Sequence, residues 1–320
     1  MRIGLLVFTF LSWTLAHAAD TYPNRPIRYI LPVAPSGGSD ITARTLAPKL
    51  IEALGQQVII DNRPGAGGVV GMSIAARAAP DGYTIVQGTI GPVAVDPSLR
   101  SNTPYDTSRD FTPIARLVSA LNILVVHQSM PVRTVKELIN YAKENPKKLN
   151  FGSSGLGHAD HLAGEIFKSM AGVQMQHIAY KGGAPAMTEL LGGNIELIFS
   201  TVSTAVTFIQ AGRIRAIAVT SDKRVSLYPD IPTVAESGLP GFVVDNWYSI
   251  LGPRDMPKSI VNRLHREFNR ALAQPDVRKR LEAFGIFPYP LPTPEAFGDY
   301  IKSETAKYAR VVKEAGIRVD

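Results

Sequence analysis

Two glycine-rich turns, each lying between a strand-like run and a helix-like run, hold the residues best suited to bind a small molecule. The first is in LPVAPSGGSDITAR (31–44) and the second in FGSSGLGHADH (151–161). A helix that begins at such a turn has N–H groups without intrahelical partners, and its dipole places positive charge there. Glycine lets a ligand approach because it has no Cβ. Both turns therefore suit an anion. For the first turn, a plain capped turn with Ser39 as the N-cap remains the alternative.

Neither glycine-rich stretch of the N-terminal half fits a nucleotide. SGGS (36–39) lacks the Lys-Ser/Thr pair of a P-loop, and GAGGVV (65–70) has Val70 where a dinucleotide fingerprint needs Gly or Ala. Both nucleotide interpretations therefore fail, and these motifs leave open which other anion the first turn would hold.

The second turn also contains residue types used in catalysis and metal binding. A nucleophile elbow at Ser154 fails, because Leu156 occupies the position of the second glycine. His158 and His161, with Asp160 between them, could form half of a metal site, but no further ligand is evident elsewhere. Histidines at a helix start without a ligand role are the default.

Lys181 and Trp247 could each contact a ligand or have a purely structural role. Lys181, in YKGGA (180–184), is either a ligand partner or a solvated loop lysine. Trp247 either packs at a hinge or touches a ligand from beside a cleft.

Alternating strands and helices must position these turns. In the helix expected at 41–54, Leu46, Leu50 and Leu54 share one face, and Pro48 should kink or shorten it. The alternation predicts parallel sheets covered on both faces. Strands are expected at 27–33, 58–61, 83–89, 149–153, 195–199 and 214–220, and further helices at 158–170, 259–274 and 293–315.

Two extended runs, LVSALNILVVH (117–127) and FVVDNWYSIL (242–251), look like crossings between two domains. The expected division is residues 19–117 plus 250–320 for domain 1 and 118–249 for domain 2. A domain inserted in this way through two strands forms a hinge.

The composition bounds the class of protein. The 320 residues are 45% hydrophobic and 19% charged, with a net charge of +7. Lys and Arg are scattered, which argues against nucleic acid as a partner. Cysteine is absent, which excludes disulfides and thiolate metal sites. MRIGLLVFTFLSWTLAHA (1–18) has the pattern of a secretory signal peptide cut after Ala18, so a periplasmic location is expected.

The series PVAPSGGSDITAR, VIIDNRPGAGGVVG, PDGYTI, FGSSGLGHADHLAGEIF and HIAYKGGAPAMTELLGGNIELIFS resembles the substrate-binding receptors of tripartite tricarboxylate transporters, the Bug receptor family. The similarity continues to the C-terminal helices. It implies a periplasmic binding protein of type II: two α/β domains that close like a flytrap about a hinge of two crossover strands. It also implies a small organic acid as ligand, held mainly by backbone amides and bridging waters.

Carried over residue by residue, the resemblance implies ligand contacts on both domains. In the first domain these are Ala34, Pro35, Ser36, Gly37, Gly38, Ser39, Asn62, Gly68 and Thr89. In the second they are Ser153, Ser154, Gly155, Gly157, His161, Gly182, Ser200 and Thr201. Relatives often have an aromatic residue near Ala34 and an aspartate near Ser200. The small residues here disfavour an amino-acid ligand, whose ammonium would lack a counter-charge.

The expected partners are the organic acid and the membrane subunits of a tripartite transporter, with no cofactor and a monomeric state. A periplasmic sensor that docks on a membrane sensor kinase uses the same fold and remains an alternative. An exported hydrolase using Ser154 with His158 or His161 is the enzyme alternative, weakened by the broken elbow.

Overall fold

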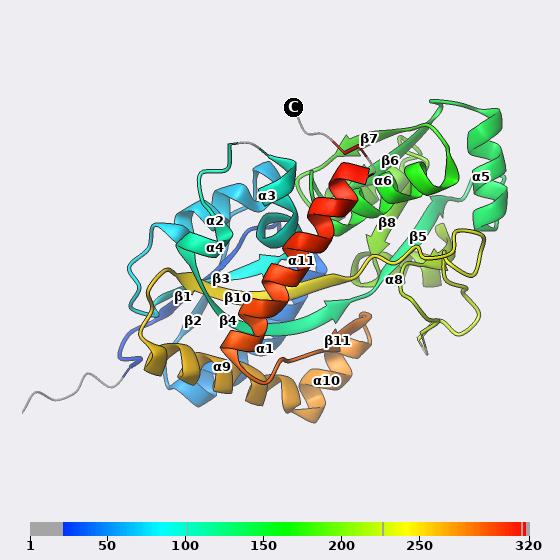
Figure 1. Cartoon of the computed structure of the whole chain (residues 1–320). Coiled ribbons are helices and arrows are strands. Elements are labelled where there is room, and N and C mark those ends of the chain that lie inside the picture. The colour runs from blue at the N-terminus through cyan, green and yellow to red at the C-terminus, as the bar shows by residue number, and fades with distance from the viewer. Residues whose placement is uncertain (1–21, 101, 226, 315, 318–320) are drawn as a thin grey trace, which may run out of the picture.

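The computed structural model describes residues 22–317, except 101, 226 and 315. The signal-peptide prediction, including its cleavage site, falls on residues 1–18 and so lies outside the described residues. Two separate β-sheets organise the chain (Figure 1). We call the part built on the six-stranded sheet the first lobe and the part built on the five-stranded sheet the second lobe.

The first lobe has the strand order β11-β4-β10-β3-β1-β2. β1 pairs in parallel with β2 and β3, whereas β10 is antiparallel to β3 and β4. Its strands are β1 (Ile27–Leu31), β2 (Val58–Asn62), β3 (Thr84–Thr89), β4 (Phe111–Ala120), β10 (Asn246–Pro253) and β11 (Ile286–Pro288).

The second lobe has the strand order β7-β6-β8-β5-β9. β6 is parallel to β7 and β8, and β5 is antiparallel to β8 and β9. The strands are β5 (Asn122–His127), β6 (Leu149–Ser153), β7 (Met175–Ala179), β8 (Leu197–Thr201) and β9 (Ile214–Val219). Both sheets are therefore mixed. The expected parallel pairing holds for β1 with β2 and β3 and for β6 with β7 and β8, but it is wrong for the strands that pair with β4, β5 and β10. The antiparallel pairs are formed by strands that lead into or out of a lobe, such as β4, β5 and β10. The alternation of strands and helices along the sequence does not predict how these strands pair.

Two segments connect the lobes. β4 ends at Ala120 and β5 begins at Asn122, so Leu121 alone separates a strand of one sheet from a strand of the other. The chain returns to the first sheet where β10 begins at Asn246. Both connections fall within the predicted crossings at 117–127 and 242–251, a few residues from the expected boundaries at 117/118 and 249/250.

Helices cover both faces of the first sheet. α1 (Gly38–Leu54), α9 (Lys258–Ala273) and α10 (Pro275–Glu282) pack on one face, where Leu46, Leu50 and Leu54 are buried as predicted. α1 continues through Pro48, so the expected shortening does not occur. The other face carries η1 (Ala66–Gly68), α2 (Val69–Ala76), η2 (Gly91–Val95), α3 (Asp96–Leu99), α4 (Thr107–Asp110) and α11 (Pro294–Glu314).

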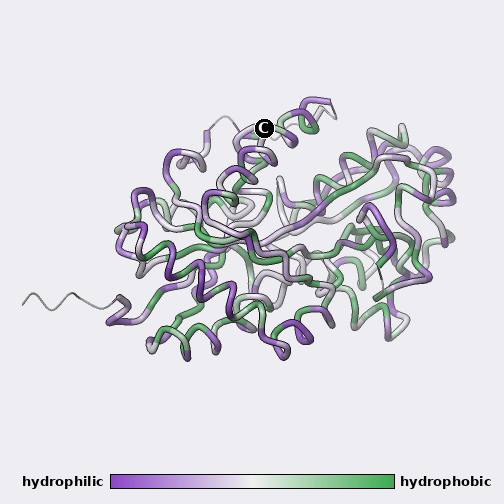
Figure 2. Tube along the Cα trace, turned by 60° about the horizontal axis from the view of Figure 1, so that its bottom comes forward, coloured by the Kyte–Doolittle hydropathy of each residue, from purple (hydrophilic) through white to green (hydrophobic). Residues whose placement is uncertain are grey.

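The second sheet is covered in the same way. Helices α5 and α6 cover one face, where Phe167 of α6 packs with Phe151 and Phe199 of the sheet, and α7 and α8 cover the other. These helices are α5 (Val135–Glu144), α6 (Ala159–Ala171), α7 (Gly183–Leu191) and α8 (Val202–Gln210). Hydrophilic and hydrophobic residues alternate along the helices of both lobes, as amphipathic covering helices require (Figure 2).

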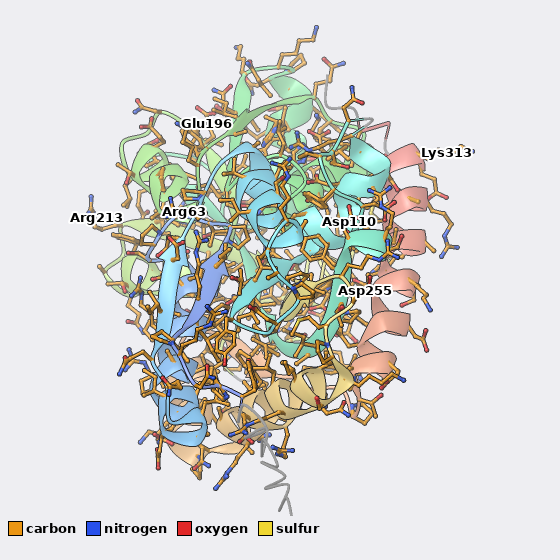
Figure 3. All side chains as sticks on the ribbon, turned by 90° about the vertical axis from the view of Figure 1, so that its left-hand side faces the viewer. Arg63, Asp110, Glu196, Arg213, Asp255 and Lys313 are labelled. Carbon is orange, nitrogen blue, oxygen red and sulfur yellow. The ribbon has the colours of Figure 1, made fainter. Side chains whose placement is uncertain are left out.

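The surface charge is dispersed. Figure 3 shows Arg213 and Lys313 on opposite sides of the molecule. In the part of the chain that the structure describes, no helix is long and apolar enough to cross a membrane.

Candidate functional site

A cleft between the lobes encloses about 610 Å³, counting its open mouth. Nine of the predicted ligand-binding residues lie on its walls: Ala34, Gly37, Gly38, Ser39, Thr89, Ser154, Gly182, Ser200 and Thr201. The two glycine-rich turns therefore do face one another. They come together because β1 and β6 both end at the side of their sheets that borders the other lobe (Figure 1).

Four helices begin at this cleft. The residues before α1, α6, α7 and α8 are Gly37, His158, Gly182 and Thr201, and all four line the cleft. None of the four helices has a side-chain N-cap, and neither do α2, α3, α9 and α10, whereas Asp106 and Thr134 cap α4 and α5. What the four share is that their uncapped ends meet at the cleft. The first N–H groups of a helix have no intrahelical partner. The four uncapped N-termini therefore direct backbone N–H groups and the positive ends of their helix dipoles at the cleft.

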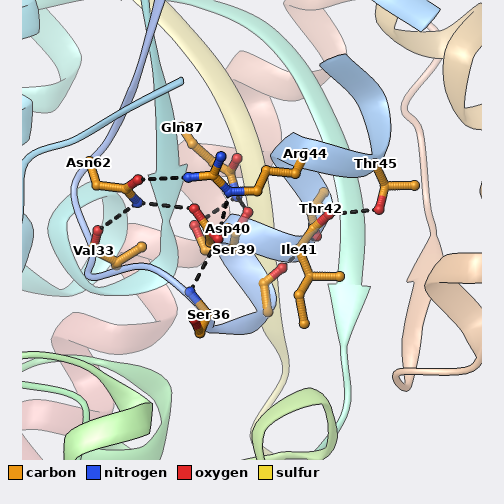
Figure 4. Close-up of polar contacts among 11 residues, drawn as sticks. Val33, Ser36, Ser39, Asp40, Ile41, Thr42, Arg44, Thr45, Asn62 and Gln87 are labelled. Carbon is orange, nitrogen blue, oxygen red and sulfur yellow. Dashed lines mark hydrogen bonds and ion pairs between the residues drawn. The ribbon is translucent and has the colours of Figure 1, made fainter. Parts of the chain in front are cut away.

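The first-lobe turn is held by one carboxylate (Figure 4). Asp40 Oδ2 accepts hydrogen bonds from Ser36 N at 3.1 Å and Arg44 Nε at 2.9 Å. Asn62 Nδ2 donates to Asp40 Oδ1 and to Val33 O, each at 3.1 Å. Burial raises the pKa of Asp40, but the hydrogen bonds from Arg44, Ser36 and Asn62 outweigh it, so the pKa lies below its usual value.

Ser39 is held from the sheet beneath it. Gln87 Nε2 donates to Ser39 Oγ at 2.8 Å and to Ser39 O at 3.1 Å. The N-cap of α1 is Gly37, in an extended conformation, so the alternative of Ser39 as N-cap was wrong. The turn therefore leads into a helix without a side-chain cap, and the buried Gln87 fixes Ser39, the second residue of that helix.

The second-lobe turn is also held by an aspartate in the first turn of a helix. Asp160 accepts from Ser154 N, from Ser154 Oγ at 3.0 Å and from His161 N at 3.0 Å. Asp160 has no Lys or Arg partner among the described residues, and burial raises its pKa. Since Ser154 Oγ bonds to Asp160 and not to a histidine, the pairing that the hydrolase alternative needs is missing.

His161 lies behind the turn and does not line the cleft. Its Nδ1 accepts from Gly157 N at 3.0 Å, and its ring packs on His177 with 4.1 Å between centroids. His177 Nε2 lies 2.6 Å from Ser153 Oγ. Burial lowers the pKa of His161 to about 3 and that of His177 to about 4. Two neutral histidines thus support the turn from behind.

His158, which the prediction of ligand contacts omitted, makes a contact between the lobes. Its Nε2 lies 3.0 Å from Gly67 O, and burial lowers the pKa of the ring. A neutral His158 donates this hydrogen bond through Nε2–H. Gly67 has φ 68°, and a Cβ there would lie 2.6 Å from Leu156 O. Glycine is required at this position because the two lobes touch through their backbones.

The floor of the cleft comes from the connecting strands. Asn122 on β5 and Asn246 and Tyr248 on β10 line it, and Asn246 Nδ2 donates to Asn122 Oδ1 at 3.3 Å. The hydroxyl of Thr89 is buried and makes no hydrogen bond within the described residues. A signal for the floor was present in the sequence, since these polar residues interrupt apolar strand-like runs.

The remaining predicted residues lie near the cleft without lining it. Asn62 and Ser36 belong to the Asp40 network, and Gly68 lines a neighbouring cavity. Trp247 is fully buried, does not line the cleft, and donates from its Nε1 to Glu304 Oε2 at 3.0 Å, so it is a packing residue. Pro35, Ser153, Gly155, Gly157 and His161 complete this set.

Metal binding at His158 and His161 finds no support in the described part of the chain. It contains no group of three or more His, Cys, Asp or Glu side chains placed to hold a metal ion.

Comparison with known proteins assigns the chain to a class. Residues 42–317 match the model of the tripartite tricarboxylate transporter family receptor. The chain belongs to this family of periplasmic solute-binding proteins, with two α/β domains, and the predicted resemblance and fold class are confirmed.

Particular relatives agree with this assignment. The protein BugT of Bordetella pertussis is 35% identical, over 94% of this chain and 93% of its own. A solved R. palustris protein with adipate has a TM-score of 0.90 and 34% identity, covering 93% of this chain and 99% of its own. MatC from Rhodopseudomonas palustris, with bound malate, has a TM-score of 0.86 and 30% identity, covering 91% and 100%. The family is one of solute-binding receptors, and the chain is not an enzyme.

Proposed function

We propose that this protein binds a small carboxylate in the cleft between its lobes and delivers it to the membrane subunits of a tripartite transporter. The four uncapped helix N-termini carry this proposal. Among the described residues, no Lys or Arg lines the cleft, so backbone N–H groups are the main positive partners for a carboxylate. The adipate and malate bound by relatives are carboxylates as well.

The polar floor supplies the remaining contacts. The Thr89 hydroxyl is free to bond to a ligand, and Asn122, Asn246 and Tyr248 offer further polar groups. Asp160 is the acidic residue on the cleft wall, but its oxygens already accept three hydrogen bonds. Burial also raises the pKa of Asp160, so this carboxyl group is a poor counter-charge for an ammonium group, which favours an organic acid over an amino acid.

We also propose the mode of action. The segments around Leu121 and before Asn246 act as the hinge between two domains, and closure buries the ligand between preformed walls. The protein works as a monomer in the periplasm after removal of residues 1–18. Mass spectrometry of the exported protein tests the cleavage after Ala18.

A thermal-shift and calorimetric screen of carboxylates tests the binding proposal, with amides and sugars of matched size as controls. A ligand present at about 100 times its Kd should stabilise the protein by about 2.7 kcal/mol. Responses to neutral analogues with none to any carboxylate would contradict the proposal.

A matched pair of glycine variants tests the location of the site. A Cβ at Gly37 meets no atom within 4 Å, so a side chain has room there, and Gly37→Val adds apolar volume to the cleft wall. Gly38 is unsuitable, because a Cβ there would lie 2.7 Å from Ser203 Oγ and 2.8 Å from the Tyr248 hydroxyl. Gly37→Val should abolish binding while the protein stays folded. Gly298→Ala, on α11, is the control and should bind normally.

The transporter partnership needs its own experiment. Uptake of the ligand by cells should require both this protein and the transporter membrane subunits. Retention of uptake without it, together with ligand-dependent capture of a sensor kinase, would favour the sensory alternative.

A further inference from the structure

A second, smaller cavity adjoins the cleft. It encloses about 290 Å³ and shares four wall residues with the cleft, namely Val33, Ser154, His158 and Gly182. Its other walls come from both lobes, because Gly65–Gly68 of the first lobe face the turn at residues 180–182 of the second. The second cavity therefore lies directly beside the part of the cleft that these four residues form.

Lys181 gives the second cavity a cation. Of the described residues that line either cavity, Lys181 alone is a lysine or arginine. Its ammonium makes no hydrogen bond or ion pair with any described residue, although the protein pairs many other cations at its surface. No aspartate or glutamate lines this cavity within the described residues. The charge of Lys181 is therefore uncompensated there.

The geometry fixes where Lys181 stands relative to the first carboxylate site. Gly182, the next residue, is the N-cap of α7 and lines both cavities. A Cβ on Gly182 would lie 3.1 Å from Ala34 Cβ, so the turn that carries Lys181 presses against the first-lobe turn. Lys181 is therefore carried by the same turn as one of the uncapped helix ends of the cleft.

We propose that Lys181 binds the second carboxylate of a dicarboxylate ligand, and thereby selects dicarboxylates over monocarboxylates of equal length. This inference rests on the proposed function, since it takes the first carboxylate to lie at the helix N-termini. Because Lys181 is exposed, the pair is screened by salt and its effect is modest.

Calorimetric titration of matched acids tests the inference. The probes are succinate, glutarate and adipate, each paired with the monocarboxylate of the same carbon number. The wild-type protein should bind at least one dicarboxylate more tightly than its partner. Lys181→Gln should weaken that dicarboxylate about fivefold and leave the monocarboxylate unchanged. Raising the salt concentration should shrink the difference between wild type and variant.

Lys143→Gln is the matched control. Lys143 is an exposed lysine on α5, in the second lobe, and lines neither cavity. This variant should bind every acid like the wild type.

Two results overturn the inference while the proposed function stands. One is a wild type that binds monocarboxylates as tightly as dicarboxylates. The other is a Lys181→Gln variant that loses both classes equally or neither. Failure of the wild type to bind any carboxylate would instead remove the proposed function itself.

Discussion

The two turns that face each other across the cleft do the same job by different means. In each, an aspartate from the first turn of a helix accepts the N–H of a serine: Asp40 from Ser36, and Asp160 from Ser154. Asp40 is also bonded to Arg44, and Ser36 is exposed. Asp160 has only neutral donors, from groups that are buried or half-buried.

This difference sets the electrostatics of the two turns. Partners lower the pKa of Asp40, whereas burial raises that of Asp160. A nearby cation stabilises the ionised form of a carboxyl group. Without a cation, only hydrogen bonds stabilise the ionised form. The second turn should therefore be the more sensitive of the two, both to substitution and to pH.

The largest expected effect comes from removing each aspartate in turn. Asp160→Ala leaves Ser154 N and His161 N without an acceptor in a buried place, and should cost about 3 kcal/mol of unfolding free energy. Asp40→Ala should cost about 1.5 kcal/mol, because Ser36 and Arg44 reach water. Urea denaturation of both variants measures the two values. Equal losses would show that the two turns do not differ in this way.

A second prediction concerns acid. His161 and His177 titrate near 6.5 when exposed, but at about 3 and about 4 in the folded protein. Below pH 6.5 the unfolded chain therefore binds more protons than the folded one, and the unfolding free energy falls as the pH drops toward 4. The contribution of His177 should reach about 2 kcal/mol, allowing for its partial exposure.

His177→Phe isolates this contribution. It keeps a ring against Phe151 and His161 but removes the titrating group. Its unfolding free energy should fall less steeply than that of the wild type between pH 6.5 and 4.5. Burial raises the pKa of Asp96 to about 6, which acts in the opposite direction and cancels when the two proteins are compared. Parallel pH curves would refute the role of His177.

The smallest effect on the unfolding free energy is expected from replacing Arg44, the cation that pairs with Asp40 in the first turn. The Arg44 side chain is 51% exposed, so its ion pair with Asp40 is screened by water. Arg44→Met should cost about 0.5 kcal/mol, and most of that difference should vanish in about 0.5 M NaCl. Thermal or urea unfolding at two salt concentrations measures this. A large loss that salt does not change would mean that the first turn depends on its cation after all.

Local sequence patterns predicted most of the strands and the four longest helices, but not the shorter helices. The helix face of Leu46, Leu50 and Leu54, the strand at 149–153 and the C-terminal helices all appear where expected. These predictions rest on periodicity, which neighbouring residues alone determine. The mixed strand order could not be predicted in the same way, because the pairing of β10 with β3 and β4 joins segments more than a hundred residues apart.

The candidate site likewise combines features that the local sequence predicts with features that it does not. The sequence by itself determined that glycine-rich turns would lead into α1 and α6, since glycine at a strand end and a helix pattern after it are local features. Only the tertiary structure decided which residues of those turns face the cleft: His158 and not His161, and Asn122, Asn246 and Tyr248 from the connecting strands. The physical reason is that a side chain's direction follows from its backbone, but what it meets there depends on how the two lobes pack.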